Sequence, residues 1–264
     1  MRARRVPRPV LVVAACLGLT VGVTVALAAV QRPADAQSDL EAEGRELYET
    51  GCISCHGTEG AGVKGPEGDV RGPSIVDAGE AGAYYQLSTG RMPLANSSDD
   101  PVRKPPAYSP TEIRALVAYV ASLGNGPPLP SVDLDGADVA AGGELFRANC
   151  QACHSAAGSG GALSYGRAAP ALHSATPEQI AAAVRSGPGQ MPVFGDAEID
   201  QRQLDELTAY VRYLREPEDP GGFPIGRIGP IPEGFVAWSV GIVALLALVF
   251  WIGTRSPIRR KEEP

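Results

Sequence analysis

The feature that most constrains this chain is a five-residue motif, Cys-x-x-Cys-His, that occurs twice. The copies are Cys52–His56 and Cys150–His154, 98 residues apart. This pattern is the covalent attachment signature of c-type haem, in which two thiols bond to the vinyl groups and the adjoining His binds the iron. A Met-Pro step follows each copy, with Met92 and Met191 lying 36 and 37 residues after the motif histidine. A Met from the opposite side completes the His/Met ligation of an electron-carrying haem.

The sequence therefore predicts two covalently bound haem c groups. The predicted thioether ligands are Cys52 and Cys55 for the first haem, and Cys150 and Cys153 for the second. The predicted iron ligands are His56 and Met92 for the first haem, and His154 and Met191 for the second. A zinc site would need two such motifs close together, and a thioredoxin-like dithiol would need a βαβ pattern that is absent. Buried Met is usually core filler, but one internal Met per repeat at matched spacing favours ligation.

The surroundings of the two motifs also repeat. Gly44–Tyr48 precedes the first motif and Gly142–Phe146 the second, with Gly and the aromatic residue four apart and so on one helix face. Downstream, residues 113–120 match 204–211 with helical apolar spacing, and Thr111 or Asp200 could start these helices. Each copy thus predicts the order helix, haem motif, loop, Met-Pro, helix.

That order resembles the class I cytochrome c domain, in which the first and last helices cross with Gly against an aromatic residue. The resemblance covers residues 42–124 and 142–216 and implies a mainly α fold. The predicted domains are 37–124 and 142–216, joined by a linker at 125–141. In the family, a proline carbonyl accepts a hydrogen bond from the proximal imidazole, which orients the ring. Pro73 and Pro170, 17 and 16 residues after the motif histidines, match that position; shaping a loop is the alternative.

Two apolar stretches bracket these domains. Residues 10–30 and 234–252 are long enough to cross a bilayer, and basic residues lie on their outer flanks, in segments 1–9 and 253–264. The positive-inside rule then puts both ends in the cytoplasm and the haem domains outside the cell membrane. Two interpretations of the first stretch stay open, a transmembrane anchor and a cleaved signal peptide. A Pro/Gly-rich linker, 217–233, leads into the C-terminal transmembrane helix. Cys16 is interpreted as an apolar residue of the first stretch rather than a lipidation site.

Charge narrows the choice of partners. Residues 37–233 contain 14 Lys and Arg against 27 Asp and Glu. This acidity makes nucleic acid an unsuitable partner and favours positively charged protein surfaces.

Several residues have two interpretations. His173 could replace Met191 on the second iron, although a surface or propionate-facing role is favoured. Arg91 and Arg185 could pair with haem propionates or be solvated surface residues. The segment 96–110 makes the first copy longer, with 27 residues from Met to the helical Tyr against 19 in the second. It is either a partner-docking loop or a tolerated surface insertion.

Two six-coordinate haems leave no open iron for substrate, which favours an electron relay. A dihaem peroxidase would need an open or His-ligated haem, and the Met of each repeat argues against it. A cytochrome subunit of a periplasmic dehydrogenase commonly lacks such a C-terminal span. Four sequence segments indicate which kind of electron relay this is, because they resemble the dihaem cytochrome c subunit of the actinobacterial cytochrome bcc complex. They are residues 88–93, 160–166, 187–192 and 229–234.

The resemblance implies a redox subunit of a menaquinol-oxidising translocase, with no independent catalytic site. Its partners would be a cytochrome b subunit and a Rieske iron–sulfur subunit. The first haem would receive an electron from the Rieske cluster, and the second would pass it to the copper centre of a cytochrome c oxidase.

Overall fold

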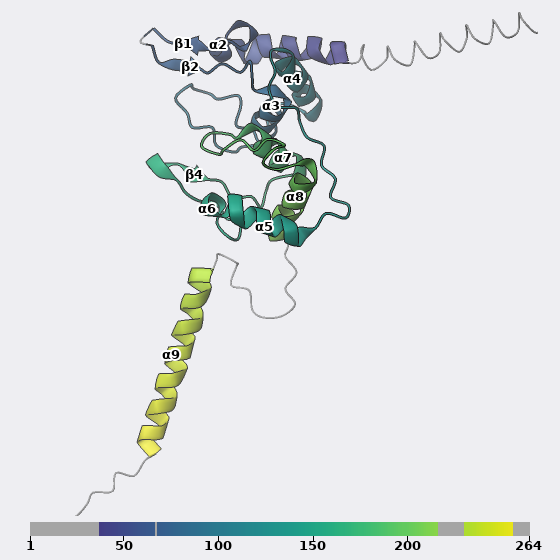
Figure 1. The fold of residues 1–264 in the computed structure, drawn as a ribbon. Helices are drawn as coiled ribbons and strands as arrows, with labels where there is room; N and C mark the ends of the chain where they lie inside the picture. Colours follow the sequence, from purple (N-terminus) through teal and green to yellow (C-terminus); the bar gives the residue numbers. More distant parts are fainter. Residues whose placement is uncertain (1–36, 67, 216–229, 256–264) are drawn as a thin grey trace, which may run out of the picture. The chain divides into compact units, whose positions relative to one another are not determined.

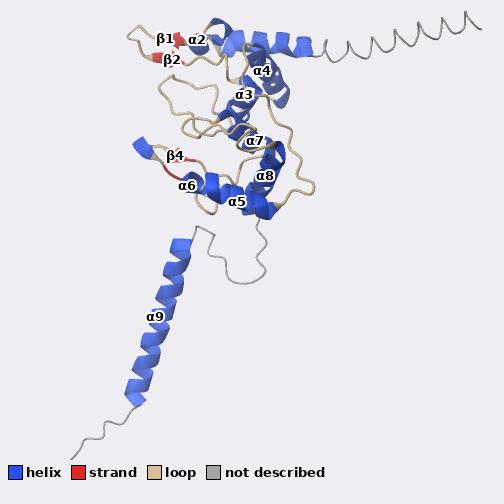
Figure 2. Ribbon diagram, in the orientation of Figure 1, coloured by secondary structure: helices blue, strands red, loops and turns tan. Residues whose placement is uncertain are grey.

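The structure is a computed structural model that describes residues 37–66, 68–215 and 230–255 (Figure 1). The predicted segments 1–9 and 10–30, nearly all of the 217–233 linker and the tail beyond 255 lie outside the described residues. The described chain is mainly helical, as expected, with a few short strands (Figure 2). Within the described residues the chain divides into two compact units, one made of residues up to Ser131 with Glu178–Glu198, and the other of Val132–Pro177 with residues from Ile199 onward.

In chain order, a helix over residues 37–51 precedes the labelled elements. These are α2 (Ile53–His56), η1 (Thr58–Gly60), β1 (Val63–Lys64), β2 (Val70–Gly72), α3 (Gly79–Ser88), α4 (Pro110–Ser122), α5 (Val139–Asn149), α6 (Gln151–His154), β3 (Gly161–Ala162), η2 (Ser164–Gly166), β4 (Ala168–Ala169), α7 (Pro177–Ser186), α8 (Gln201–Arg215) and α9 (Pro230–Arg255).

In the first unit, the helix over 37–51 crosses α4 at a glycine. A Cβ on Gly44 would lie 2.0 Å from the Ala115 carbonyl oxygen, so only glycine lets the two backbones meet here. One turn later, the Tyr48 and Tyr119 rings pack with centroids 5.1 Å apart. The core around them is made of apolar side chains from α3, α4 and the first helix, namely Tyr48, Ala83, Leu87, Ile113, Leu116, Val117, Tyr119 and Val120.

Helix α4 begins at Pro110, and its N-cap lies two residues before Thr111, which was the wrong choice of start. Ser109 is the N-cap, and its hydroxyl accepts from the Glu112 N–H while the Glu112 carboxylate accepts from the Ser109 N–H. Pro110 occupies the first helical position, where its missing N–H costs no hydrogen bond. Asp200 is the correct start for α8, since its carboxylate accepts from the Gln203 N–H at 2.9 Å.

In the second unit, α5 crosses α8 in the same manner. A Cβ on Gly142 would lie 2.0 Å from the Glu206 carbonyl oxygen. The Phe146 and Tyr210 rings pack with centroids 5.4 Å apart. The Asp138 side chain caps α5 by accepting from the N–H groups of Ala140 and Ala141.

The segment between motif and Met-Pro is more than the loop that was expected. In both copies it contains a short antiparallel hairpin, β1–β2 and β3–β4, and a ten-residue helix, α3 and α7. The buried residues of α3 face two sides: Ala83 and Leu87 join the core with α4, whereas Ala81 and Tyr85 pack with Ala182 of α7. A helix that is apolar on two faces lacks the one-sided period by which amphipathic helices are recognised.

Helix α9 is long and apolar enough to cross a membrane. Within Glu233–Arg255, an 18-residue window has a mean hydropathy of 2.5, and none of that window is buried within the protein. The Arg255 guanidinium lies over the Trp251 ring, 4.6 Å from its centroid, at the basic end of the helix.

Candidate haem sites

Each motif follows directly on a helix. The N–H of Cys52 donates to the Tyr48 carbonyl at 2.9 Å, and the His56 N–H donates to the Cys52 carbonyl at 2.9 Å. None of the four motif cysteines forms a disulfide. Burial, and secondarily the neighbouring cysteine, raises the pKa of Cys52 and of Cys150 to about 11. The first thiol of each motif is therefore protonated at neutral pH in the chain without haem.

The motif histidines both meet a proline carbonyl. His56 Nδ1 lies 2.8 Å from the Pro73 carbonyl oxygen, and His154 Nδ1 lies 3.0 Å from that of Pro170. A carbonyl only accepts, so Nδ1 carries the proton and donates it. The other ring nitrogen, Nε2, then has a free lone pair in a fixed orientation, which is the arrangement of a metal-binding imidazole.

Met92 lies in a segment held by main-chain hydrogen bonds in the first unit. Its N–H donates to the Gln86 carbonyl at 3.1 Å, and the Met92–Pro93 peptide bond is cis. The Met92 side chain and Cys52 both pack against the core of the first unit. The structure thus brings one cysteine and the methionine that would hold the first haem to one core.

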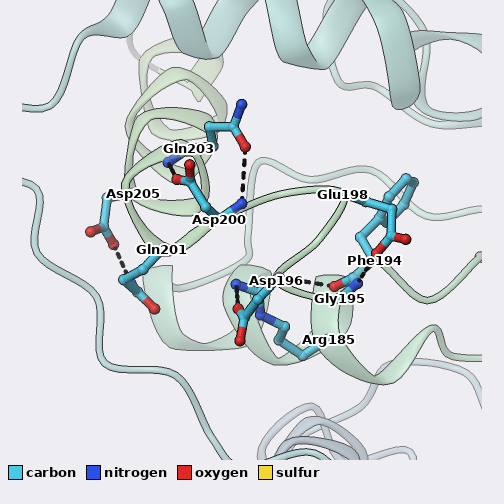
Figure 3. Close-up of polar contacts among 9 residues, drawn as sticks. All are labelled: Arg185, Phe194, Gly195, Asp196, Glu198, Asp200, Gln201, Gln203 and Asp205. Carbon is cyan, nitrogen blue, oxygen red and sulfur yellow. Dashed lines mark hydrogen bonds and ion pairs between the residues drawn. The ribbon is translucent and has the colours of Figure 1, made fainter.

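Met191 lies in a turn that folds back onto the end of α7. Its N–H donates to the Pro188 carbonyl at 3.2 Å, and the Phe194 N–H donates to the Val184 carbonyl at 3.0 Å. Arg185 braces this turn, with Nη1 donating to the Phe194 carbonyl at 2.9 Å and Nη2 2.7 Å from the Asp196 carboxylate (Figure 3). The Met191 turn belongs to the first compact unit and the Cys150–His154 motif to the second. Their pairing on one iron stays a prediction.

Family models match both repeats. Residues 41–124 match the model described as cytochrome c, and residues 137–211 match cytochrome C oxidase, cbb3-type, subunit III. A cytochrome bc1 complex cytochrome c subunit of Corynebacterium efficiens is 38% identical over 270 residues, covering 92% of this chain and 90% of that protein. The subunit of the same name from Mycobacterium tuberculosis is 39% identical over 255 residues, covering 90% and 89%. That from Corynebacterium diphtheriae is 38% identical, covering 97% of this chain and 98% of the relative.

The chain belongs to the family of cytochrome bc1 complex cytochrome c subunits. This confirms the resemblance found in the sequence. Members of this family are subunits of a membrane-bound redox complex, so the chain takes part in haem-mediated electron transfer, and its cytochrome c domains imply covalently bound haem c.

The donor chemistry of the chain fits that group. Each motif offers two cysteines that form no disulfide, beside an imidazole whose Nδ1 is already engaged. An imidazole nitrogen and a thioether sulfur are the axial donors of cytochromes c. The residues present are therefore those that covalent haem requires.

The two arginines that precede the methionines are buried, so the interpretation as solvated surface residues is wrong. Arg91 is 9% exposed and Arg185 is 7% exposed. The Arg91 guanidinium lies 4.9 Å from the centroid of the Tyr85 ring, and its buried Nη1 has no hydrogen-bond partner in the described chain. Pairing of Arg91 with a haem propionate would satisfy that donor and stays a prediction.

His173 is exposed, and its Nε2 donates to the Ala157 carbonyl at 2.8 Å. Two side-chain contacts near the sites escaped the sequence analysis. The Tyr48 hydroxyl donates to the Gly57 carbonyl, just after the first motif, at 2.7 Å. Gln179 is a buried amide on α7 with partners in the first repeat. The sequence gives no sign of these contacts, because Tyr48 stands at an ordinary core position and Gln179 is a polar residue inside a short helix.

Proposed function

We propose that this chain is a membrane-anchored cytochrome c with two haems, relaying electrons in a menaquinol-oxidising complex of the cytochrome bcc type. The observation that carries the proposal is the repeated histidine geometry. Both motif histidines donate from Nδ1 to a proline carbonyl, at 2.8 and 3.0 Å, at nearly the same distance along the chain. Each copy therefore has an imidazole prepared to bind iron through Nε2.

In this proposal the cysteines attach the haems and the His and Met residues bind the irons. The first site uses Cys52, Cys55, His56 and Met92; the second uses Cys150, Cys153, His154 and Met191. Haem c supplies a reversible one-electron iron couple when bound. With one His and one Met holding each iron, no position would be left for substrate, so no independent catalytic site is proposed.

The proposed partners are those that the sequence resemblance implies. The 37–124 domain would receive electrons from the Rieske iron–sulfur subunit, beside a cytochrome b subunit. The 142–216 domain would deliver them to the copper centre of a cytochrome c oxidase. Tethering both domains in one chain raises the effective concentration of donor at acceptor, in place of a diffusing carrier. The acidic haem domains favour positively charged docking surfaces on these partners.

Residues 234–252 of α9 would be the anchor, with the basic tail in the cytoplasm and both haem domains on the extracytoplasmic side. The length and hydropathy of α9 support this role, as does the placement of Arg255 at its C-terminal end. The segment 10–30 would be either a second anchor or a signal peptide.

The proposal is tested by counting haem in the purified full-length protein with the pyridine haemochrome assay and by recording its near-infrared spectrum. We expect two covalent haems, both with the weak band of Met-bound ferric haem and neither binding carbon monoxide. A haem that binds carbon monoxide or peroxide would mean an open iron, and the peroxidase alternative would then be preferred.

Met92→Ala tests the order of the relay, with Met191→Ala as the matched variant. Met92→Ala should open the first haem and lower its potential, because thioether ligation raises it. Quinol-driven reduction of the second haem should then stop in the assembled complex. Met191→Ala should leave reduction of the first haem intact and block delivery to the oxidase. Unchanged turnover of the Met92→Ala complex would contradict the assignment.

A further inference from the structure

Helix α7 belongs by sequence to the second repeat, yet it packs within the first compact unit. Ala81 and Tyr85 of α3 and Ala182 of α7 form one buried cluster, with Ala81 and Ala182 fully excluded from solvent. Small side chains let the helices approach closely: a Cβ placed on Gly82 would lie 3.8 Å from the Ser186 Cβ. The methionine-bearing part of the second repeat is thus packed on the first.

A buried amide joins the two helices. Gln179 of α7 is only 6% exposed. Its Nε2 donates to the Ser88 carbonyl at 3.1 Å and reaches the Ser88 hydroxyl at 3.3 Å, while its Oε1 accepts from Arg103 Nη2 at 2.8 Å. A buried polar group costs stability unless its hydrogen bonds are made, and here both ends of the amide are used. Such a group fits only one relative arrangement of its partners.

Arg103 comes from the 96–110 segment, which makes the first repeat longer than the second. This segment lies along the Met92 segment. The Lys104 N–H donates to the Thr89 carbonyl at 3.2 Å, and its Nζ donates to the Pro93 carbonyl at 2.8 Å. Gly90 has a φ of +66°, and a Cβ there would lie 2.1 Å from the Lys104 carbonyl oxygen. The extra residues are therefore held on both sides of Met92.

The contacts continue to Met191. Gln179 lies at the start of α7, and the turn after α7 carries Met191. That turn is held to the last residues of α7 through Phe194 and Arg185. A continuous set of packed residues and hydrogen bonds connects the two methionine segments within one compact unit.

We propose that Gln179, Ser88 and Arg103 form an internal clasp that fixes the Met92 and Met191 segments to one another. This inference deepens the proposed function and rests on it for its role in electron transfer. Gln179 is a positioning residue: it acts through Ser88 and Arg103 on the first methionine segment, and through α7 on the second. The 96–110 segment serves this internal purpose, where docking of a partner protein was one of the expectations.

A cysteine cross-link tests the contact itself. Disulfides need Cβ atoms about 3.5–4.5 Å apart, and the Gly82–Ser186 spacing of 3.8 Å lies in that range. In full-length Gly82→Cys/Ser186→Cys protein, mild oxidation should link the peptides that contain the two new cysteines, as read by mass spectrometry. The single variants, made in parallel, identify background linkage. Because this readout needs no haem, absence of the cross-link overturns the clasp whatever the outcome for the proposed function.

Gln179→Leu tests the effect on the haems. The leucine keeps the bulk of the side chain and removes both kinds of hydrogen bond, so both methionine segments should be displaced more easily from iron. We expect the affinity of both ferric haems for added imidazole to rise by about three- to tenfold, from a loss of hydrogen bonds to an amide and a charged group. Gln203→Leu, in the cap of α8, is the control and should leave the first haem unchanged. Wild-type imidazole affinity in Gln179→Leu, or a change at one haem alone, overturns the clasp.

Discussion

The helix crossings of the two repeats are nearly identical in their contacts, whereas their methionine segments are braced by different residues. Gly44 and Gly142 would each place a Cβ 2.0 Å from a carbonyl oxygen of the crossing helix. The aromatic pairs that follow have centroids 5.1 and 5.4 Å apart, with interplanar angles of 53° and 49°. Only glycine fits at either crossing position, since the backbones of the two helices are in contact there.

The methionine segments have no such common constraint. In the first repeat the 96–110 segment supplies Lys104, which donates twice to the residues around Met92. In the second repeat Arg185 holds the methionine segment, through its contacts with the Phe194 carbonyl and the Asp196 carboxylate. A methionine need only present one sulfur, so different polar contacts can hold it. The two repeats thus share the same contacts where two helices cross, and differ in the contacts that hold the methionine.

The largest effect is expected when the crossings are forced apart. Gly44→Ala and Gly142→Ala should each lower the free energy of unfolding by at least about 2 kcal/mol, because overpacking against backbone outweighs the ~1 kcal/mol gained in helix propensity. Guanidinium unfolding followed by haem absorbance measures this. Gly143→Ala is the control within α5, since its Cβ would meet the edge of the Tyr210 ring, a side chain able to move. An unchanged free energy of unfolding in Gly44→Ala or Gly142→Ala would mean that the helices at that crossing can move apart at little cost.

A smaller effect separates the two aromatic positions. Tyr48 is 1% exposed and donates to the Gly57 carbonyl at 2.7 Å, whereas Phe146 has no hydroxyl to offer Ser155 at the matching place. Gly57 and Ser155 share an unusual backbone conformation, with φ of 74° and 63°. Tyr48→Phe should cost about 1 kcal/mol of unfolding free energy, the value of one buried hydrogen bond. Phe146→Tyr should gain a hydrogen bond from the new hydroxyl to the Ser155 carbonyl. A loss of stability in that variant would contradict the equivalence of positions 48 and 146.

The same tyrosine gives this comparison a pH dependence. Burial, and secondarily the nearby Cys52, raises the pKa of Tyr48 from 10.0 to about 12. The folded state then keeps a proton that the unfolded state releases, so this stabilisation is complete below pH 10 and declines as pH rises toward 12. Tyr48→Phe should therefore show a shallower loss of stability than wild type across this window. Parallel curves would contradict the pKa shift.

How much of this could be predicted from the sequence depends on the range of the interactions. The histidine–proline contacts and Asp200 as the start of α8 were anticipated because spacing along the chain carries them. Thr111 was the wrong helix start, although Ser109 followed three residues later by Glu112 is a recognisable capping pattern. The capping pattern was present in the sequence, but the helix start was assigned to Thr111 instead of Ser109.

The missed features depend on contacts between distant segments. The two-sided helix α3 has no one-sided apolar period, because it packs on both α4 and α7. Gln179 looks like a surface residue in the sequence, and its partners, 76 and 91 positions away, account for its burial. Polar burial is decided by tertiary packing, which local periodicity does not encode.

The smallest expected effect separates the two helix caps. Glu112 closes the first cap and Gln203 closes the second, where its Oε1 accepts from the Asp200 N–H at 2.9 Å (Figure 3). Hydrogen bonds from the backbone and then the side chain of Ser109 lower the pKa of Glu112 below its ordinary value of 4.5. The stabilisation is present above pH 4.5 and is lost as pH falls through the lowered pKa.

Exchanging the two closing residues should exchange this acid sensitivity. Glu112→Gln keeps an acceptor for the Ser109 N–H and removes the titrating group, so its melting temperature should fall less steeply than that of wild type below about pH 4.5. Gln203→Glu should acquire the slope that Glu112→Gln loses, since the new carboxylate would accept from the Asp200 N–H beside the N-terminus of α8. The other carboxylates are common to all three proteins and cancel in the differences. If all three curves run parallel from about pH 3 to 6, the caps contribute equally in acid and the two repeats do not differ at this position.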